Sequence, residues 1–327
     1  MQPMVRAIYR VAAIPGACSP YDRVNLKIYY PALYGDSPEE RNSGVIPAQR
    51  QLAPYPVVVL LPGINLGGDS NAWLALRLAQ AGYATVVTTA ISEEMPGYIS
   101  VSPGLLLDQL KPDSYGSGPS CSLLQPVLEE MNKVQESSIL AGMLDLEHIV
   151  LGGHSAGGTA ALLNANPDWM PGICGAFAYA AHSGASMALG WPAETVLELP
   201  GRVPVMLLGG DRDGVIAASA HRYGRTEADP LHTIARTFED GVAPGEDKSY
   251  LMILRGANHF TFANPHDGST GREFLDWESE GEPEVLRGHL GDLLLDFLAA
   301  LVHGDSAAQE RLDGHLHNPG LALARRK

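Results

Sequence analysis

Ser155 stands between two glycines in the stretch Gly-His-Ser-Ala-Gly at residues 153–157. An apolar run at 149–151 precedes this stretch, and a run of small, helix-forming residues follows it. A sharp turn from a strand into a helix pushes a serine side chain away from the backbone, and it brings neighbouring chain so close that Gly153 and Gly157 leave no room for a side chain. The positive end of the following helix suits a developing negative charge. The pattern therefore predicts a nucleophilic serine at position 155.

A serine hydroxyl needs a general base within hydrogen-bond reach, and that base needs an acid to hold its tautomer. In this arrangement both follow the serine in the chain, with the acid before the histidine. The loop after 205–208 offers two acids, and we select Asp213 because it lies further past the strand end, while Asp211 is expected to brace the turn. The loop after 250–254 offers His259 as the base. Its rival is His266, which is next to Asp267.

Two backbone N–H groups are needed to stabilise the negative oxygen that develops on an attacked carbonyl. We expect the first from Ala156, directly after the nucleophile, and the second from Ile64 in the loop after 57–61, where Gly63 permits close approach. The glycine-rich stretch at 63–68 resembles a phosphate cradle, but it lacks the Lys-Ser/Thr ending and the dinucleotide spacing. The stretch Asp-Arg-Asp-Gly at 211–214 lacks the further ligands of a calcium loop, and the histidines near 259 complete no metal cluster. We therefore expect neither a cofactor nor a metal.

Alternating strand and helix patterns must position these groups. Apolar runs typical of strands occur at 26–30, 57–61, 84–89, 149–151, 176–180, 205–208 and 250–254, and amphipathic helical patterns occur at 71–81, 123–140, 156–164 and 285–302. This alternation predicts an α/β fold with a mostly parallel sheet that is covered on both faces. We expect a single domain over residues 1–304, with excursions at about 92–121 and 217–248. The tail at 305–327 is expected to be flexible.

Composition and charge restrict the partners. The 327 residues contain 37 acidic and 22 basic side chains, a net charge of −15, which argues against nucleic acid and against a polybasic membrane anchor. No apolar run reaches the ~18 residues of a membrane span. Three cysteines are too few for a disulfide framework, and the odd number fits a reduced compartment, or one bridge with one free thiol. Because no signal peptide is visible, we expect a cytoplasmic protein, or a secreted one whose leader was removed.

At these residues the chain resembles the α/β-hydrolase superfamily, within it the branch of cutinase-like polyester hydrolases, chlorophyllases and platelet-activating-factor acetylhydrolases. The resemblance runs from about LKIYYPA to the closing helix and is carried by four blocks: PVVVLLPGINLGGDSNAWLALRLAQAGYATVV, LEHIVLGGHSAGGTAAL, VPVMLLGGDRDGVI and LRGANHFTF. It implies an α/β-hydrolase fold, to which residues 217–248 could add a partial lid. It also implies Ser155 as nucleophile, His259 as base and Asp213 as orienting acid, with Ile64 and Ala156 as oxyanion donors.

The chain departs from this family at three points. His182 occupies the place where the polyester hydrolases tend to carry a substrate-clamping tryptophan, which argues against an aromatic polyester. The C-terminal disulfide of secreted cutinases has no counterpart, and the interval between Asp213 and His259 is enlarged by 217–248, which could cover the site. We assign His182 and Asn65 to the substrate-binding region.

The expected activity is hydrolysis of a small carboxylic ester through a covalent acyl-enzyme, without a cofactor. Two alternatives remain open from the sequence. The same three residues would serve a thioesterase, an acyltransferase or a perhydrolase, and a protein of this fold could instead bind a ligand without turning it over. The oligomeric state and the natural substrate do not follow from the sequence.

Overall fold

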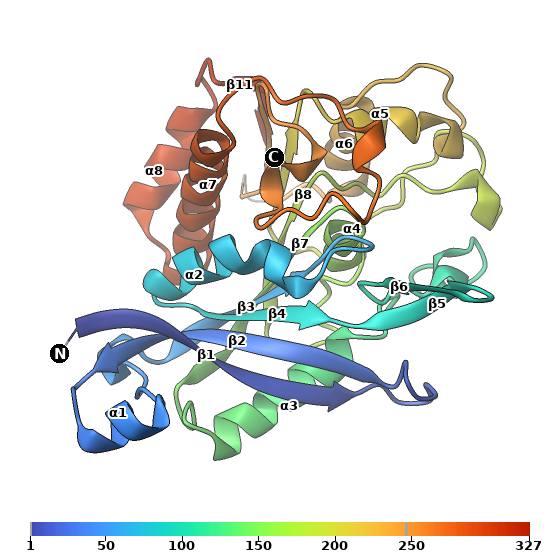
Figure 1. Ribbon diagram of the computed structural model, residues 1–327. Helices are drawn as coiled ribbons and strands as arrows, with labels where there is room; N and C mark the ends of the chain where they lie inside the picture. The colour runs from blue at the N-terminus through green and yellow to red at the C-terminus, as the bar shows by residue number, and fades with distance from the viewer. Residues whose placement is uncertain (1, 246–247) are drawn as a thin grey trace.

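Continuous apolar runs form the middle of a large sheet in the computed structural model, which describes residues 2–245 and 248–327. These residues form a nine-stranded sheet in the order β1-β2-β4-β3-β7-β8-β9-β10-β11 (Figure 1). β3 (Tyr55–Leu61) is buried along its whole length, as a parallel strand covered on both faces should be. Its neighbours in the parallel part of the sheet are β4 (Ala84–Thr89), β7 (Leu144–His154), β8 (Ile173–Tyr179), β9 (Val205–Gly210) and β10 (Tyr250–Leu254). The expectation of a mostly parallel α/β fold is confirmed.

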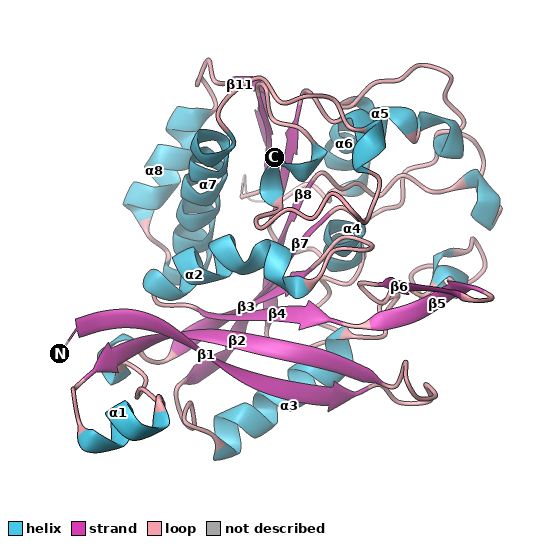
Figure 2. Cartoon of the chain, in the orientation of Figure 1, coloured by secondary structure: helices cyan, strands magenta, loops and turns pink. Residues whose placement is uncertain are grey.

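Helices cover both faces of this sheet. The predicted helices correspond to α2 (Ala72–Gln80), α3 (Leu124–Ser137), α4 (Ala156–Leu162) and α7 (Pro283–His303). Figure 1 shows α2 and α7 on one side of strands β1 to β4 and α3 on the other. Shorter helices are α1 (Pro38–Ser43), α5 (Gly214–Ala218) and α6 (His232–Arg236), which join the longer elements in Figure 2. No helix among the described residues is long and apolar enough to cross a membrane.

The N-terminal edge of the sheet is a strand that the sequence pattern did not predict. β1 (Gln2–Ala13) pairs antiparallel with β2 (Arg23–Tyr34) over its whole length, and β2 is antiparallel to β4. Arg6 and Arg10 interrupt the apolar pattern of β1, which an edge strand tolerates because one side of it faces solvent. The Arg10 guanidinium donates to the carboxylate of Glu130 in α3 at 2.7 Å, so the edge is attached to the helix beneath it.

The expectation of a flexible tail at 305–327 is wrong. These residues form α8 (Ser306–His315), which packs against α7, and β11 (Leu321–Arg326), which pairs antiparallel with β10 and closes the sheet. The carboxylate of Asp305 caps α8 by accepting from two backbone N–H groups. Ala308 and Leu312 are fully buried. The polar composition of the segment concealed these few apolar positions, which are enough to attach it.

The two excursions are short ordered pieces. The first contains the hairpin β5 (Ile91–Met95) and β6 (Tyr98–Val101) and the turn η3 (Leu107–Leu110). The second contains η5 (Ala220–Tyr223), α6 and the π-helical turn η6 (Thr237–Gly241); residues 246–247, also within it, lie outside the described part of the chain. Cys18, Cys121 and Cys174 are free thiols.

Candidate active site

Ser155 lies at the junction of β7 and α4 in a conformation that side chains rarely adopt, with φ 55° and ψ −126°. Close packing of the chain around it explains the flanking glycines. A Cβ at Gly157 would lie 2.2 Å from the main-chain oxygen of Leu61, and one at Gly153 would lie 2.4 Å from the carbonyl carbon of Gly157. The local sequence thus creates a strained turn at which the serine hydroxyl projects beyond the sheet.

His259 and Asp213 lie in line with Ser155. The Nε2 of His259 is 3.0 Å from the Oγ of Ser155, and its Nδ1 is 2.8 Å and 3.0 Å from the two carboxylate oxygens of Asp213. Asp213 is fully buried and His259 nearly so, whereas Ser155 is partly accessible. In the neutral tautomer the Nδ1–H of His259 donates to Asp213, and its Nε2 accepts the proton of the serine hydroxyl. Such a chain of contacts can raise the nucleophilicity of a serine.

Main-chain N–H groups hold the acid and histidine loops. Asp213 caps α5 by accepting from the N–H of Ile216 at 2.8 Å. A further carboxylate, that of Asp276, accepts from the N–H of Gly214 and, at 3.3 Å, from that of Phe260, so it bridges the two loops. Burial, and then the nearby Asp213, raise the pKa of Asp276 above its usual value. Asp276 was not anticipated, because nothing in its local sequence connects it with either loop.

Asp211, the other candidate for the acid, braces the turn as expected. Asp211 accepts from the N–H of Gly256 at 2.7 Å and so connects the ends of β9 and β10. The rival base, His266, bonds Glu273 at 3.0 Å and packs its ring on Phe260, away from Ser155. Among the residues that the structure describes, no group of three or more His, Cys, Asp and Glu side chains is arranged to hold a metal ion.

His154, the residue before Ser155, is hydrogen-bonded to the loop that carries His259. Its Nε2 is 2.9 Å from the backbone oxygen of His259, and since a carbonyl oxygen only accepts, this nitrogen carries the proton. The ring is fully buried, stacks on Phe262 and lies 4.9 Å from the ring of His259. Burial, and then the proximity of His259, lower the pKa of His154 well below its usual range. A neutral imidazole therefore supports the backbone at His259.

The loop after β3 lies directly over Ser155. A Cβ at Gly63 would be 3.3 Å from the Cβ of Ser155, so only a glycine lets the chain come this near with ease. The predicted donors Ile64 and Ala156 both line the hollow that contains Ser155. Within the described part of the chain neither backbone N–H has an acceptor, which leaves both available to an oxyanion.

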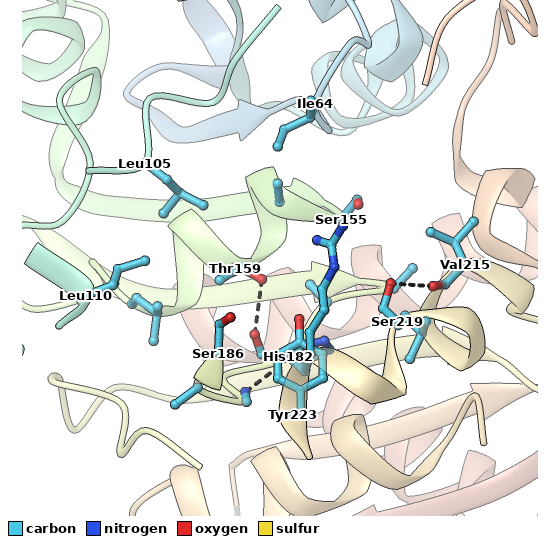
Figure 3. Close-up of a pocket in the computed structure, with 18 of the residues that line it drawn as sticks. Ile64, Leu105, Leu110, Ser155, Thr159, His182, Ser186, Val215, Ser219 and Tyr223 are labelled. Atoms are coloured by element: carbon cyan, nitrogen blue, oxygen red, sulfur yellow. Dashed lines mark hydrogen bonds between the residues drawn. The ribbon is translucent and has the colours of Figure 1, made fainter. Parts of the chain in front are cut away.

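A hollow of about 230 Å³ opens beside Ser155 (Figure 3). Figure 3 shows Leu105 and Leu110, from the first excursion, on the side opposite Val215 and Ser219. The second excursion supplies Ser219, Arg222 and Tyr223 to the wall, so both excursions shape the space over the serine. A second hollow of about 260 Å³ shares Ser155 and His259 with the first.

The predicted substrate-binding residues lie in these hollows. His182 lines the first; its Nδ1 accepts from the N–H of Gly184 at 3.1 Å and its ring packs edge-on against Tyr223. Burial lowers the pKa of His182 to about 4, with the carboxylate of Asp213 acting in the opposite direction. Asn65 lines the second hollow, and its side-chain amide donates to the hydroxyl of Tyr98 at 3.1 Å.

Comparison with known proteins does not identify a relative of this chain. No protein-family model matches the chain, and no curated protein matches it either. The chemical interpretation therefore depends on the residues and distances of the site itself.

Two cations beside Ser155 were missed by sequence reasoning. Arg222 and Arg272 line both hollows. Each comes from an irregular segment with no periodic pattern, so no sequence signal placed either near the serine. The chain has a net charge of −15, so its composition does not indicate a positively charged site. The two arginines form one only because the fold brings their segments together.

Proposed function

We propose that this protein is a serine hydrolase of the α/β-hydrolase fold that cleaves carboxylic esters. The observation that carries the proposal is the contact series from Asp213 through His259 to the hydroxyl of Ser155, which ends at a hollow with two free N–H groups. The strained backbone of Ser155 also favours catalysis over simple binding, because such a conformation costs about 1–3 kcal/mol and a binding module has no need of it.

The proposed reaction has two steps. His259 takes the proton of Ser155 through Nε2 while Oγ attacks the ester carbonyl, and the N–H groups of Ile64 and Ala156 stabilise the oxyanion. The carbon–oxygen bond to the alcohol then breaks, and the alcohol leaves with the proton from His259. Water attacks the acyl-enzyme in the same way, which releases the acid and restores the serine. Asp213 stabilises the imidazolium in both steps.

The experiment is active-site labelling with a fluorophosphonate, combined with turnover of a short-chain p-nitrophenyl ester. The serine oxygen of the wild type should displace fluoride and become phosphonylated, and the ester should give a burst of p-nitrophenol. Ser155→Ala should abolish labelling and lower turnover by ~10⁴-fold or more. A wild type that stays unlabelled at neutral pH and releases no p-nitrophenol would contradict the proposal.

The chain offers matched controls for the other two residues. His259→Gln and Asp213→Asn should each lower kcat by orders of magnitude. His266→Gln and Asp211→Asn should leave it within a fewfold of wild type, since neither side chain contacts Ser155 or His259, and the introduced asparagine keeps an acceptor for the N–H of Gly256. Turnover with an added alcohol distinguishes hydrolysis from acyl transfer, because an acyltransferase would form the new ester in preference to the acid.

A further inference from the structure

Two arginine side chains face the space over Ser155 from separate segments. Arg222 belongs to η5 and Arg272 to the loop before the turn η8 (Glu273–Leu275), and both line each of the hollows that contain Ser155 and His259. Arg272 is half-buried and Arg222 is exposed. Cations are expensive to hold near each other in a partly dehydrated hollow unless an anion joins them.

Neither guanidinium has an ion-pair partner among the residues that the structure describes. Arg272 donates one hydrogen bond, to the hydroxyl of Ser219 at 3.3 Å, and a guanidinium has five donor hydrogens. The nearby Arg225 shows the contrast, because it faces Glu194 at 3.4 Å and Glu227 at 3.8 Å and is neutralised within the protein.

The electrostatics of Arg272 agree with an unfilled anion site. Burial, and then repulsion from Arg222, lower the pKa of Arg272. Asp213 attracts Arg272, but its oxygens already bond the imidazole of His259 and the N–H of Ile216. A negative group between the two guanidiniums would relieve their repulsion and accept from their free N–H groups.

The position of the arginines indicates which part of the substrate carries the charge. In the proposed reaction His259 gives its proton to the departing alcohol, so the alcohol lies on the His259 side of Ser155. Both arginines are connected to that side. Arg222 follows α5, the helix that Asp213 caps, and Arg272 is hydrogen-bonded to Ser219 at the end of α5. The leucines Leu105 and Leu110 line the opposite wall (Figure 3).

We propose that Arg222 and Arg272 bind a carboxylate on the alcohol portion of the substrate, while the acyl chain occupies the leucine-lined wall. This assignment of substrate class rests on the proposed esterase function. The two arginines are binding residues, which select an anionic ester.

The test compares two esters of the same shape, para-butyryloxybenzoate and the neutral para-butyryloxybenzamide, each rate being divided by its own hydroxide-catalysed rate. The wild type should prefer the benzoate in kcat/KM by about tenfold, the size expected for charge-assisted contacts at a partly exposed site. The doubly substituted Arg222→Gln, Arg272→Gln protein should lose the preference, because its kcat/KM for the benzoate falls toward that for the benzamide. The corresponding pair of lysine substitutions should keep part of the preference.

Arg236→Gln is the control for loss of an arginine near the site, because Arg236 lies in the same excursion as Arg222, pairs with Asp240 and lines neither hollow. It should keep the full preference, and about 1 M salt should weaken the preference in the wild type. Equal kcat/KM for the two esters in the wild type, or a preference that survives in the double glutamine variant, would overturn the proposal.

A binding measurement separates this proposal from the catalytic one. The ethers para-butoxybenzoate and para-butoxybenzamide cannot be hydrolysed, and calorimetry should give the wild type about tenfold tighter binding of the benzoate, a difference that the double glutamine variant loses. If no ester is turned over but this difference is found, the esterase proposal fails and the anion site stands. Equal affinity for the two ethers in the wild type overturns the anion site, whatever the activity.

Discussion

His182 contributes a neutral imidazole to the wall of the hollow. Its Nδ1 accepts from Gly184, so its Nε2 carries the proton, and a second proton would place a charge in a buried position. Protonation of His182 is therefore unfavourable in the folded protein, where burial lowers its pKa to about 4 from the ordinary value of 6.5.

The stability of the protein should therefore fall with pH through this residue. Between about pH 6.5 and pH 4 the unfolded chain binds a proton at His182 that the folded chain does not, so the free energy of unfolding decreases as pH falls through that interval, and the contribution is constant below it. The loss is on the order of 3 kcal/mol, from 1.36 kcal/mol per unit of pKa shift. Urea denaturation at several pH values measures it.

His182→Asn is the informative variant, because its side-chain oxygen can still accept from the N–H of Gly184. Its free energy of unfolding should depend less steeply on pH between 6.5 and 4 than that of the wild type. Equal slopes for His182→Asn and the wild type would show that His182 is not held neutral.

The turn between β7 and α4 requires a glycine at position 157. A methyl group at position 157 would collide with the main-chain oxygens of Leu61 at 2.2 Å and Pro62 at 2.4 Å, and backbone cannot rotate away as a side chain can. We expect Gly157→Ala to cost about 2–3 kcal/mol or more of stability and to lower ester turnover by shifting the loop that carries Ile64.

Gly288 provides the control for that substitution. It lies within α7, and a Cβ there would meet no atom within 4 Å, so Gly288→Ala should stabilise the protein by about 0.5–1 kcal/mol. Denaturant unfolding and p-nitrophenyl ester kinetics on both variants test the pair. Turnover and stability of Gly157→Ala equal to those of the wild type would mean that the turn is not so tightly packed.

Elements with an apolar period could be predicted from the sequence, and elements attached by a few contacts could not. β3 and β10 are fully buried, so their composition alone marks them as strands. β1 and β11 are edge strands whose apolar pattern is interrupted by charged residues. Their pairing with β2 and β10 is a long-range fact that no local window contains. The hairpin of β5 and β6 pairs locally, but it lies in a segment rich in Gly, Pro and Ser, and this composition concealed it.

The candidate site divides in the same way. Ser155, Asp213 and His259 could be selected because each follows a strand, and parallel strands bring such loops to one edge of the sheet. Arg222 and Arg272 come from irregular segments, so their convergence on the serine is a property of the whole molecule and not of any element. The arginines of the proposed anion site are accordingly less accessible from sequence than the three residues of the contact series.

Residues 305–327 contribute to the stability of the whole molecule. α8 and β11 complete the face of α7 and the edge of β10, the strand that leads to His259, so the end of the chain supports the site from a distance. Ending the chain at Gly304 would expose the edge of β10 and the apolar surface against which Leu312 packs. We expect the truncated protein to be less stable by several kcal/mol and prone to aggregate through the open edge.

Thermal unfolding and light scattering measure both effects, and Leu312→Ala isolates the packing contribution at unchanged chain length. Leu312 is fully buried, so this substitution should cost about 2–4 kcal/mol and lower Tm, while the β10–β11 pairing and the solubility of the folded state remain. The truncated protein should show the larger loss, because it also leaves the N–H and C=O groups on one side of β10 without partners. A truncated protein with the Tm and solubility of the full chain would mean that residues 305–327 are dispensable, and that β10 and His259 are held in place without them.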